Sequence, residues 1–231
     1  MVRAYAGERL WTRLEVLGEG VLRLILNRPD KKNALSIALR DEVTESLAVL
    51  AADEAVKLLV LTGAGNIFSA GFDLREFEGL GDAEHAERLW ASSDRFHRAW
   101  LGFPLPTLAV VNGPAIAGGF DLAVMCDIRI ASQTASFLHP EVAFGDVVYA
   151  PLHDLVGGAV ARDLCLTGRK VDAAEAKALG LVSSVVSASD LDEEAARWSA
   201  RMSAAPRHLL QRTKAKIIRR AAIDAAKTLD L

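Results

Sequence analysis

Short apolar runs alternate with longer stretches of helical period along most of the chain. Val, Leu and Ile dominate the runs, which is typical of strands that are covered on both faces of a parallel sheet. Four runs predict such strands, at 20–26, 56–62, 108–111 and 127–131. The stretches between them predict crossover helices, so the pattern as a whole indicates an α/β fold.

The helical stretches carry apolar residues at steps of three and four. Between 37 and 52, Leu39, Val43 and Leu47 recur along one face, and Ser36 is a suitable N-cap. The other helices are expected at 82–100, 121–125, about 152–167, 173–178, 191–204 and 208 to about 229. Because the end of the chain is helical and Ala-rich, we expect an α/β core over 1–190 and a helical C-terminal extension over 191–231.

Composition and charge narrow the class of protein. The 231 residues are 51% hydrophobic and 25% charged, which excludes disorder and collagen-like repetition. The 27 Lys and Arg against 30 Asp and Glu give a net charge of −3, so no bulk basic field favours nucleic acid or a membrane surface. Cys126 and Cys165 each lie in an apolar run and predict buried reduced thiols. With no signal peptide and no membrane span expected, the sequence predicts a cytoplasmic protein.

Two glycine-bearing turns follow predicted strands, at 68–74 and 112–122. Loops at the carboxyl ends of parallel strands are where α/β folds bind ligands. A helix that begins at Gly118 would present free N–H groups at the positive end of its dipole, and two such groups aimed at one point can stabilise an oxyanion. Glycines at strand-to-helix turns also serve backbone geometry alone, and the pattern by itself leaves both interpretations open.

A series of segments carries a more specific signal. They are LNRPDKKNAL at 26–35, LVLTGAG at 59–65, FSAGFDL at 68–74, PTLAVVNG at 106–113, GGFDLAVMCD at 118–127, PEV at 140–142, and LTGR at 166–169 followed by AAEAKALGLV at 173–182. In these segments and in their order the chain resembles the crotonase (enoyl-CoA hydratase/isomerase) superfamily. The resemblance implies a spiral of ββα units, acyl-CoA thioester substrates and assembly as a homotrimer or hexamer. It implies no separate cofactor, since coenzyme A is part of the substrate. It also implies further C-terminal helices, and the C-terminal region here is expected to be shorter than in the family, either because the sequence is truncated or because this member assembles differently.

The resemblance also implies roles for individual residues. The backbone N–H groups of Phe72 and Gly118 are the expected oxyanion donors, and Glu141 is the expected principal acid/base. Asp121 stands where the hydratases carry a second glutamate. A pair of carboxylates is what water addition needs, one to activate water and one to move the α-proton. Aspartate is one methylene shorter and occurs here in some isomerases, so hydration and double-bond isomerisation both stay open, as does a purely structural role for Asp121 in the first turn of a helix.

Coenzyme A is expected along two of the loops. The resemblance points to the backbone around Lys32 and Ala34 for the adenine and pantetheine, and to Ala70, Asp73 and Leu74 beside the thioester. Asp146 is either a third acid or a surface carboxylate. His85, His97 and His208 are expected on polar helix faces, and because no pair of histidines has metal-ligand spacing we expect no metal.

Two other functions stay open at this point. One is a hydrolase that cleaves a thioester or a β-diketone C–C bond, for which His139, His153 or Asp154 would supply polar groups. The segment 147–155, which contains two of these, departs most from the family pattern and is expected to line the acyl pocket. The other is an inactive acyl-CoA-binding protein. Glu141 and Asp121 argue against it, since a binder does not need two carboxylates beside the thioester.

Overall fold

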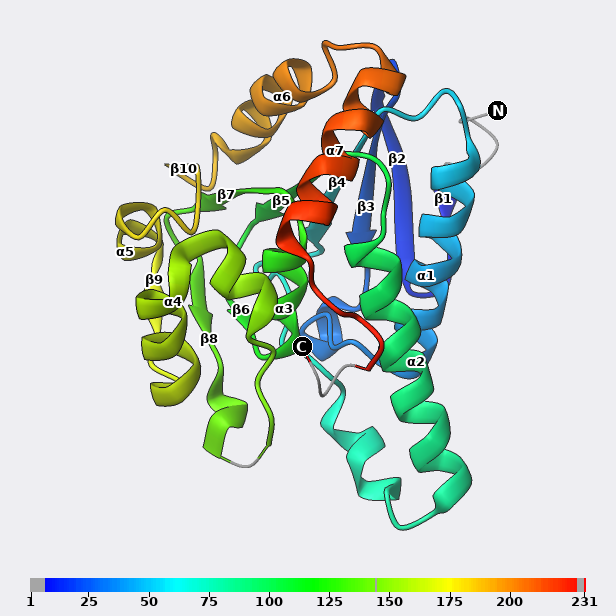
Figure 1. Cartoon of the computed structure of the whole chain (residues 1–231), viewed down its shortest axis with the longest axis vertical. Coiled ribbons are helices and arrows are strands. Elements are labelled where there is room, and N and C mark those ends of the chain that lie inside the picture. The colour runs from blue at the N-terminus through cyan, green and yellow to red at the C-terminus, as the bar shows by residue number, and fades with distance from the viewer. Residues whose placement is uncertain (1–6, 144, 228–230) are drawn as a thin grey trace.

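A seven-stranded sheet forms the centre of the computed structural model, which describes residues 7–143, 145–227 and 231 (Figure 1). Its strands run in the order β1 (Gly7–Glu8), β2 (Thr12–Gly18), β3 (Val21–Leu26), β4 (Leu58–Gly63), β5 (Thr107–Val111), β7 (Ile128–Ser132) and β10 (Ser184–Val186). Strands β1 to β3 pair antiparallel, and every pair from β3 to β10 is parallel. A smaller sheet has the order β6 (Ala115–Ile116), β8 (Ser136–Leu138) and β9 (Val171–Asp172).

Helices follow the strands as the periodicity predicts. They are α1 (Ile37–Ala52), α2 (Ala83–Leu101), α3 (Gly118–Met125), α4 (Ala150–Thr167), α5 (Ala173–Ala178), α6 (Leu191–Met202) and α7 (Arg207–Ala221), with the short 3-10 helices η2 (Pro29–Lys31), η3 (Leu74–Gly79) and η4 (Pro140–Ala143). The Ser36 hydroxyl accepts a hydrogen bond from the Leu39 amide at 3.3 Å, so the N-cap predicted for α1 is confirmed. The structure thus has the mixed α/β fold that the sequence predicts.

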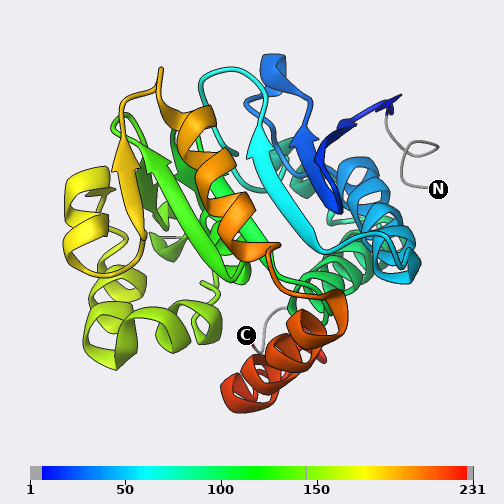
Figure 2. The ribbon, with the colours of Figure 1, turned by 90° about the horizontal axis from the view of Figure 1, so that it is seen from above.

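Strand β4 illustrates why the sheet is apolar on both faces. Leu59 and Leu61 point into the larger core, whereas Leu58 and Val60 join a smaller cluster on the opposite face. Leu191 of α6 closes that second cluster, and Figure 2 shows α6 lying across the sheet. Because neighbouring side chains point to opposite faces, a near-continuous apolar run is what a strand between two packed layers requires. The division of the chain at residue 190 stays a prediction.

The C-terminal helix is shorter than the sequence predicts. We expected helix to about residue 229, but α7 ends where Ala222 adopts a left-handed conformation with φ of 51°. The chain that follows runs beside α2, where the Arg98 guanidinium donates to the Ala226 carbonyl at 2.7 Å. This tertiary contact replaces the helical continuation that the composition favours. Residues 228–230 of the predicted helix lie outside the described residues.

A buried ion pair joins helix α7 to Asp127, which lies between α3 and β7. The Lys214 ammonium lies 2.6 Å from the Asp127 carboxylate, and a mainly apolar cavity of about 370 Å³ lies beside this contact, among α3, α4 and α7. Neither Glu141 nor Asp121 lines this cavity.

Cys126, which does line the cavity, and Cys165 are both buried free thiols, as predicted. Across the described residues, none of the helices combines the length and the apolar composition needed to cross a bilayer.

Candidate active site

Loops from the carboxyl ends of β3, β4 and β5 meet at one edge of the main sheet. The Leu35 amide donates to the Gly71 carbonyl at 2.8 Å, which joins the first loop to the second. The Ile116 amide donates to the Ser69 carbonyl at 3.0 Å, which joins the second to the third. The two glycine-bearing turns of the sequence are therefore neighbours, as expected for successive parallel strands.

Two asparagine side chains hold the second loop in place. Asn33 is fully buried, and its amide donates to the carbonyls of Ala64 at 2.9 Å and Ile67 at 3.0 Å. Asn112 donates to the Gly63 carbonyl at 2.9 Å from the other side. The sequence analysis assigned these asparagines no role, although both lie in the segments that carry the resemblance.

The amides of Phe72 and Gly118 lie close together. A Cβ built on Gly71 would be 2.9 Å from the Gly118 nitrogen, and a Cβ built on Gly118 would be 3.0 Å from Cδ1 of Phe72. Ala117 has φ of 52° and ψ of −130°, and this unusual conformation starts α3 at Gly118, three residues before the predicted helix. Among the described residues, neither amide has a hydrogen-bond acceptor.

A buried arginine supports the Phe72 ring. The Arg40 guanidinium lies 4.4 Å from the ring centroid and donates to the carbonyls of Leu35 at 2.6 Å and Leu89 at 3.2 Å. Burial lowers the pKa of Arg40 to about 10, which still leaves it charged at neutral pH. No role was predicted for Arg40, although an arginine three positions before Val43, on the apolar stripe of α1, is a signal of a buried charged residue.

One histidine prediction is wrong. His97 was expected on a polar face of α2, but it is 2% exposed. Its ring packs against Phe96 and Phe72, and Nδ1 contacts the Ser93 carbonyl at 2.8 Å. The apolar face of α2 is wider than the pattern indicated, because it must cover both α1 and the Phe72 loop.

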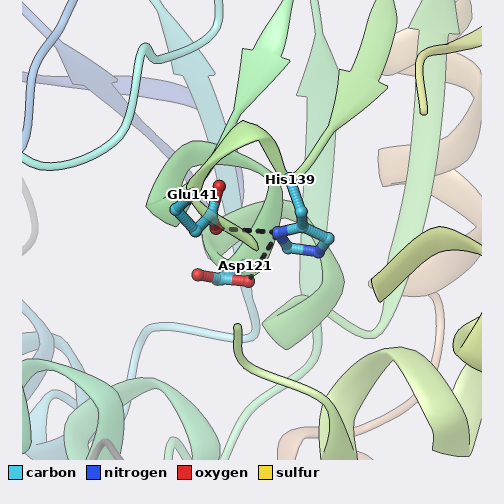
Figure 3. A group of neighbouring side chains, drawn as sticks. All are labelled: Asp121, His139 and Glu141. Carbon is cyan, nitrogen blue, oxygen red and sulfur yellow. Dashed lines mark hydrogen bonds and ion pairs between the residues drawn. The ribbon is translucent and has the colours of Figure 1, made fainter. Parts of the chain in front are cut away.

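Two carboxylates and one imidazole form a compact group (Figure 3). His139 Nδ1 lies 2.9 Å from Oε1 of Glu141 in η4 and 3.7 Å from Oδ1 of Asp121 in α3. Their side chains are 0%, 13% and 7% exposed, respectively. The parallel pairing of β6 with β8 causes this encounter, because α3 follows β6 and His139 follows β8. The structure therefore brings together the two predicted carboxylates and adds a histidine that was named only for the hydrolase alternative.

Burial dominates the electrostatics of this group. It raises the pKa of Asp121 to about 7; His139 acts to lower that pKa and Glu141 to raise it. Burial acts to lower the pKa of His139, but Asp121 and the hydrogen bond to Glu141 outweigh it, so that the pKa is raised. Burial and the two carboxylates raise the pKa of the Cys165 thiol to about 11. At neutral pH these shifts favour a protonated His139 and a partly protonated Asp121, and Cys165 stays neutral.

The same three side chains have the donor types of a divalent cation site, but neither their spacing nor the second nitrogen of His139 is typical of one. Their ligand atoms lie within 4.8 Å of one another. Two ligands on opposite sides of a zinc or similar ion are at most about 4.2 Å apart. A metal-bound histidine also donates its other ring N–H to an acceptor, whereas His139 Nε2 is buried and has no partner in the described part of the chain.

The other predicted residues lie on the loops after β3 and β4 or on the surface. The Ala70 amide donates to the Lys32 carbonyl at 2.9 Å, so these two backbone segments are adjacent, and Ala34 is buried beside them. Asp73 pairs with Arg28 at 3.1 Å and caps η3, while Leu74 is 67% exposed. Exposed positions are occupied by Asp146, His153 and Asp154.

Known proteins resemble this chain in sequence and in fold. The model of the enoyl-CoA hydratase/isomerase family matches residues 17–230. The chain belongs to this family. A mitochondrial enoyl-CoA hydratase of Pongo abelii is 37% identical over 177 residues, covering 74% of this chain and 59% of that protein. A 4-chlorobenzoyl coenzyme A dehalogenase-2 of an Arthrobacter species is 34% identical over 207 residues, covering 86% and 75%. A solved enoyl-CoA hydratase/carnithine racemase from Magnetospirillum magneticum superposes with a TM-score of 0.86 at 31% identity, covering 93% of this chain and 82% of that one.

Members of the enoyl-CoA hydratase/isomerase family are enzymes, and the similar dehalogenase indicates that neighbouring sequences can carry a different reaction. The family therefore fixes the fold and the class of protein, and the reaction has to be argued from the residues of this chain.

The raised pKa of Asp121 predicts a pH-dependent stability. In the folded state the pKa is about 7, above the ordinary aspartate value of 3.8, so Asp121 contributes stability below about pH 4 and loses it as the pH rises through 7. Asp121→Asn removes this loss. We expect the variant to gain stability relative to the parent by the order of 4 kcal/mol between about pH 4 and pH 9. Urea unfolding across that range measures the gain.

The exposed Asp146→Asn is the matched control, for which the difference from the parent should not change with pH. A flat difference for Asp121→Asn over the same range would mean that the Asp121 carboxyl is ionised without penalty in the folded protein.

Proposed function

We propose that this chain catalyses proton transfer on an acyl-CoA thioester whose enolate oxygen is stabilised by the Phe72 and Gly118 amides. The best-supported reaction is addition of water to a 2-enoyl-CoA. Double-bond isomerisation is the second candidate, because it uses the same enolate. The observation that carries the proposal is the closeness of two unpaired backbone amides in a chain that also holds a carboxylate pair, one member of which, Asp121, lies in the first turn of the same helix, α3.

The two amides suit a thioester carbonyl. Its oxygen gains negative charge when the α-carbon is deprotonated or when the β-carbon is attacked, and fixed donors stabilise that charge without reorganising. The α3 dipole adds to the effect, because its positive end lies at Gly118.

The carboxylates suit an acid and a base at one pH. The pKa of Asp121, about 7, lets this group hold a proton at neutral pH, and Glu141 Oε1 lies 2.9 Å from Nδ1 of the same imidazole. One group can then activate water or remove a proton, and the other can deliver a proton. The shorter Asp121 side chain does not prevent this division of roles, since both carboxylates reach the same imidazole nitrogen.

The hydrolase alternative has less support. His153 and Asp154 are exposed on α4, and His139 is fully buried with Nδ1 engaged by Glu141. A hydrolase of this kind needs a group that activates water against the thioester carbonyl itself. Burying two carboxylates together costs folding free energy. An inactive binding protein gives no reason for that cost, whereas a catalytic acid–base pair does.

Labelled solvent tests the proposed reaction. With a 2-enoyl-CoA in ¹⁸O-labelled heavy water, we expect a product with one ¹⁸O atom at the β-carbon and one deuterium at the α-carbon, read by mass spectrometry. Double-bond movement without oxygen uptake would assign isomerisation instead. Release of free coenzyme A as the sole reaction would contradict the proposal and favour the hydrolase.

Binding of coenzyme A is proposed along the adjacent backbone segments at Lys32, Ala34 and Ala70, with Asp73 and Leu74 nearer the thioester. The exposed cations Lys31, Lys32 and Arg75 suit its phosphates. Assembly as a homotrimer or hexamer remains part of the proposal, and light scattering measures it.

A further inference from the structure

His139 is the one member of the buried group that the proposed reaction does not require. Its ring stacks on Phe120 with centroids 4.5 Å apart and planes inclined by 28°. Phe120 immediately precedes Asp121 on α3, so the stacking contact fixes the ring next to the Asp121 carboxylate. The side chain of His139 has no exposed surface, so it cannot turn outward without opening the core.

The two ring nitrogens of His139 have different surroundings. Nδ1 faces both carboxylates, at 2.9 Å from Glu141 and 3.7 Å from Asp121, as Figure 3 shows. An ionised carboxylate only accepts hydrogen bonds, so Nδ1 must carry a proton when Glu141 is ionised. Nε2 has no partner among the described residues. The hydrogen bond to Glu141 is therefore the polar contact that orients this ring, in addition to the stacking on Phe120.

The charged groups around His139 indicate that its imidazole supplies a positive charge. The titratable groups that face it are Asp121 from α3 and Glu141 from η4, and the Cys165 thiol of α4 lies near the same two carboxylates. Cys165 is neutral, so two carboxylates face each other and the imidazole is the group that can bring a positive charge between them. Two carboxylates at such a separation cannot both ionise easily in a buried place without a cation.

We propose that His139 is a positioning residue for the carboxylate pair: Nδ1–H holds Glu141 in place by a hydrogen bond, and the imidazolium charge keeps Asp121 able to give up and regain its proton near neutral pH. This inference rests on the proposed function, because it explains how the pair operates rather than which substrate it uses. It gives His139 no contact with substrate.

His139→Gln separates the two effects. The glutamine amide can still donate to Glu141, but it carries no charge. An opposite charge at about 4–6 Å lowers a carboxyl pKa by about 1–3 units, so we expect the titration midpoint of Asp121 to rise by about one unit or more in the variant. Carbon-13 NMR of the labelled Asp121 carboxyl, assigned with Asp121→Asn, measures this without substrate.

Two further variants make the result specific. Glu141→Gln should move the Asp121 midpoint in the opposite direction, since Glu141 acts to raise it. His208→Gln, an exposed position on α7, should leave the midpoint unchanged. In the pH dependence of turnover, the apparent pKa that reports Asp121 should rise in His139→Gln. A purely structural role of His139 would not cause this rise.

Several outcomes would overturn the inference. An unchanged Asp121 midpoint in folded His139→Gln would show that His139 is neutral in the group. Should that variant fail to fold, nitrogen-15 NMR of the parent is decisive: His139 must stay protonated above the pH of about 6.5 at which an ordinary histidine loses its proton. A midpoint that moves when the parent is treated with EDTA would assign the group to a metal. Because the titrations need no substrate, they remain informative if the labelling experiment contradicts the proposed reaction.

Discussion

Glu141→Gln is expected to abolish turnover while the affinity for a CoA thioester stays nearly unchanged. The amide keeps the shape of the side chain, and its oxygen can still accept the hydrogen bond that His139 donates at 2.9 Å. It cannot take up or release a proton, so the contribution of general acid–base catalysis, ~10²–10⁴-fold in rate, is lost. Steady-state kinetics and calorimetry with an unreactive acyl-CoA give the rate and the affinity separately.

Glu193→Gln serves as the control for this change. Its side chain is 74% exposed on α6, so the same chemical substitution there should not alter kcat. If the folded Glu141→Gln enzyme keeps kinetic constants within a few-fold of the parent, Glu141 moves no proton in the reaction.

Gly118→Val is expected to slow the reaction by at least a hundredfold. A Cβ at this position already lies 3.0 Å from Cδ1 and 3.2 Å from Cε1 of Phe72, so the two added methyl groups must displace the ring. The ring cannot retreat freely, because the Arg40 guanidinium lies 4.4 Å from its centroid. Both proposed donors then move, and the loss of one alone costs ~3–4 kcal/mol.

The comparison for Gly118→Val must be made on folded protein. Circular dichroism and the size of the assembly are to match the parent, since the crowded ring also carries packing energy. Gly81→Val is the control, because a Cβ at Gly81 meets nothing within 4 Å. Full activity of a folded Gly118→Val enzyme would remove this amide from the oxyanion site.

The sequence predicts the main sheet and its helices well because their signals are local. An apolar run such as β4 needs both faces covered, and α1 has an apolar stripe and a capping serine in its own sequence. Strands β6, β8 and β9 have only two or three residues, too few to show a period. The end of α7 depends on a contact with Arg98, which no local pattern contains.

The candidate site divides in the same way. Glu141, Asp121 and the two glycine-bearing turns could be named because they lie in recognisable segments. The role of His139 could not, because it depends on which strand pairs with β8. Arg40 reaches Phe72 across two loops that only the fold brings together. Their contributions are tertiary, and a single sequence reports tertiary neighbours poorly.

The backbone of Ala117 connects the proposed oxyanion site with the thermal stability of the protein. A residue with a side chain held at φ of 52° and ψ of −130° costs about 1–3 kcal/mol, whereas glycine there would cost only about 0.5–1 kcal/mol in lost chain freedom. A programme of thermostabilisation would therefore select Ala117→Gly early. The same exchange widens the range of directions open to the Gly118 amide, which the alanine now restricts. The Ala117 methyl group, which takes no part in the proposed chemistry, would thus lower thermal stability while it favours the catalytic rate.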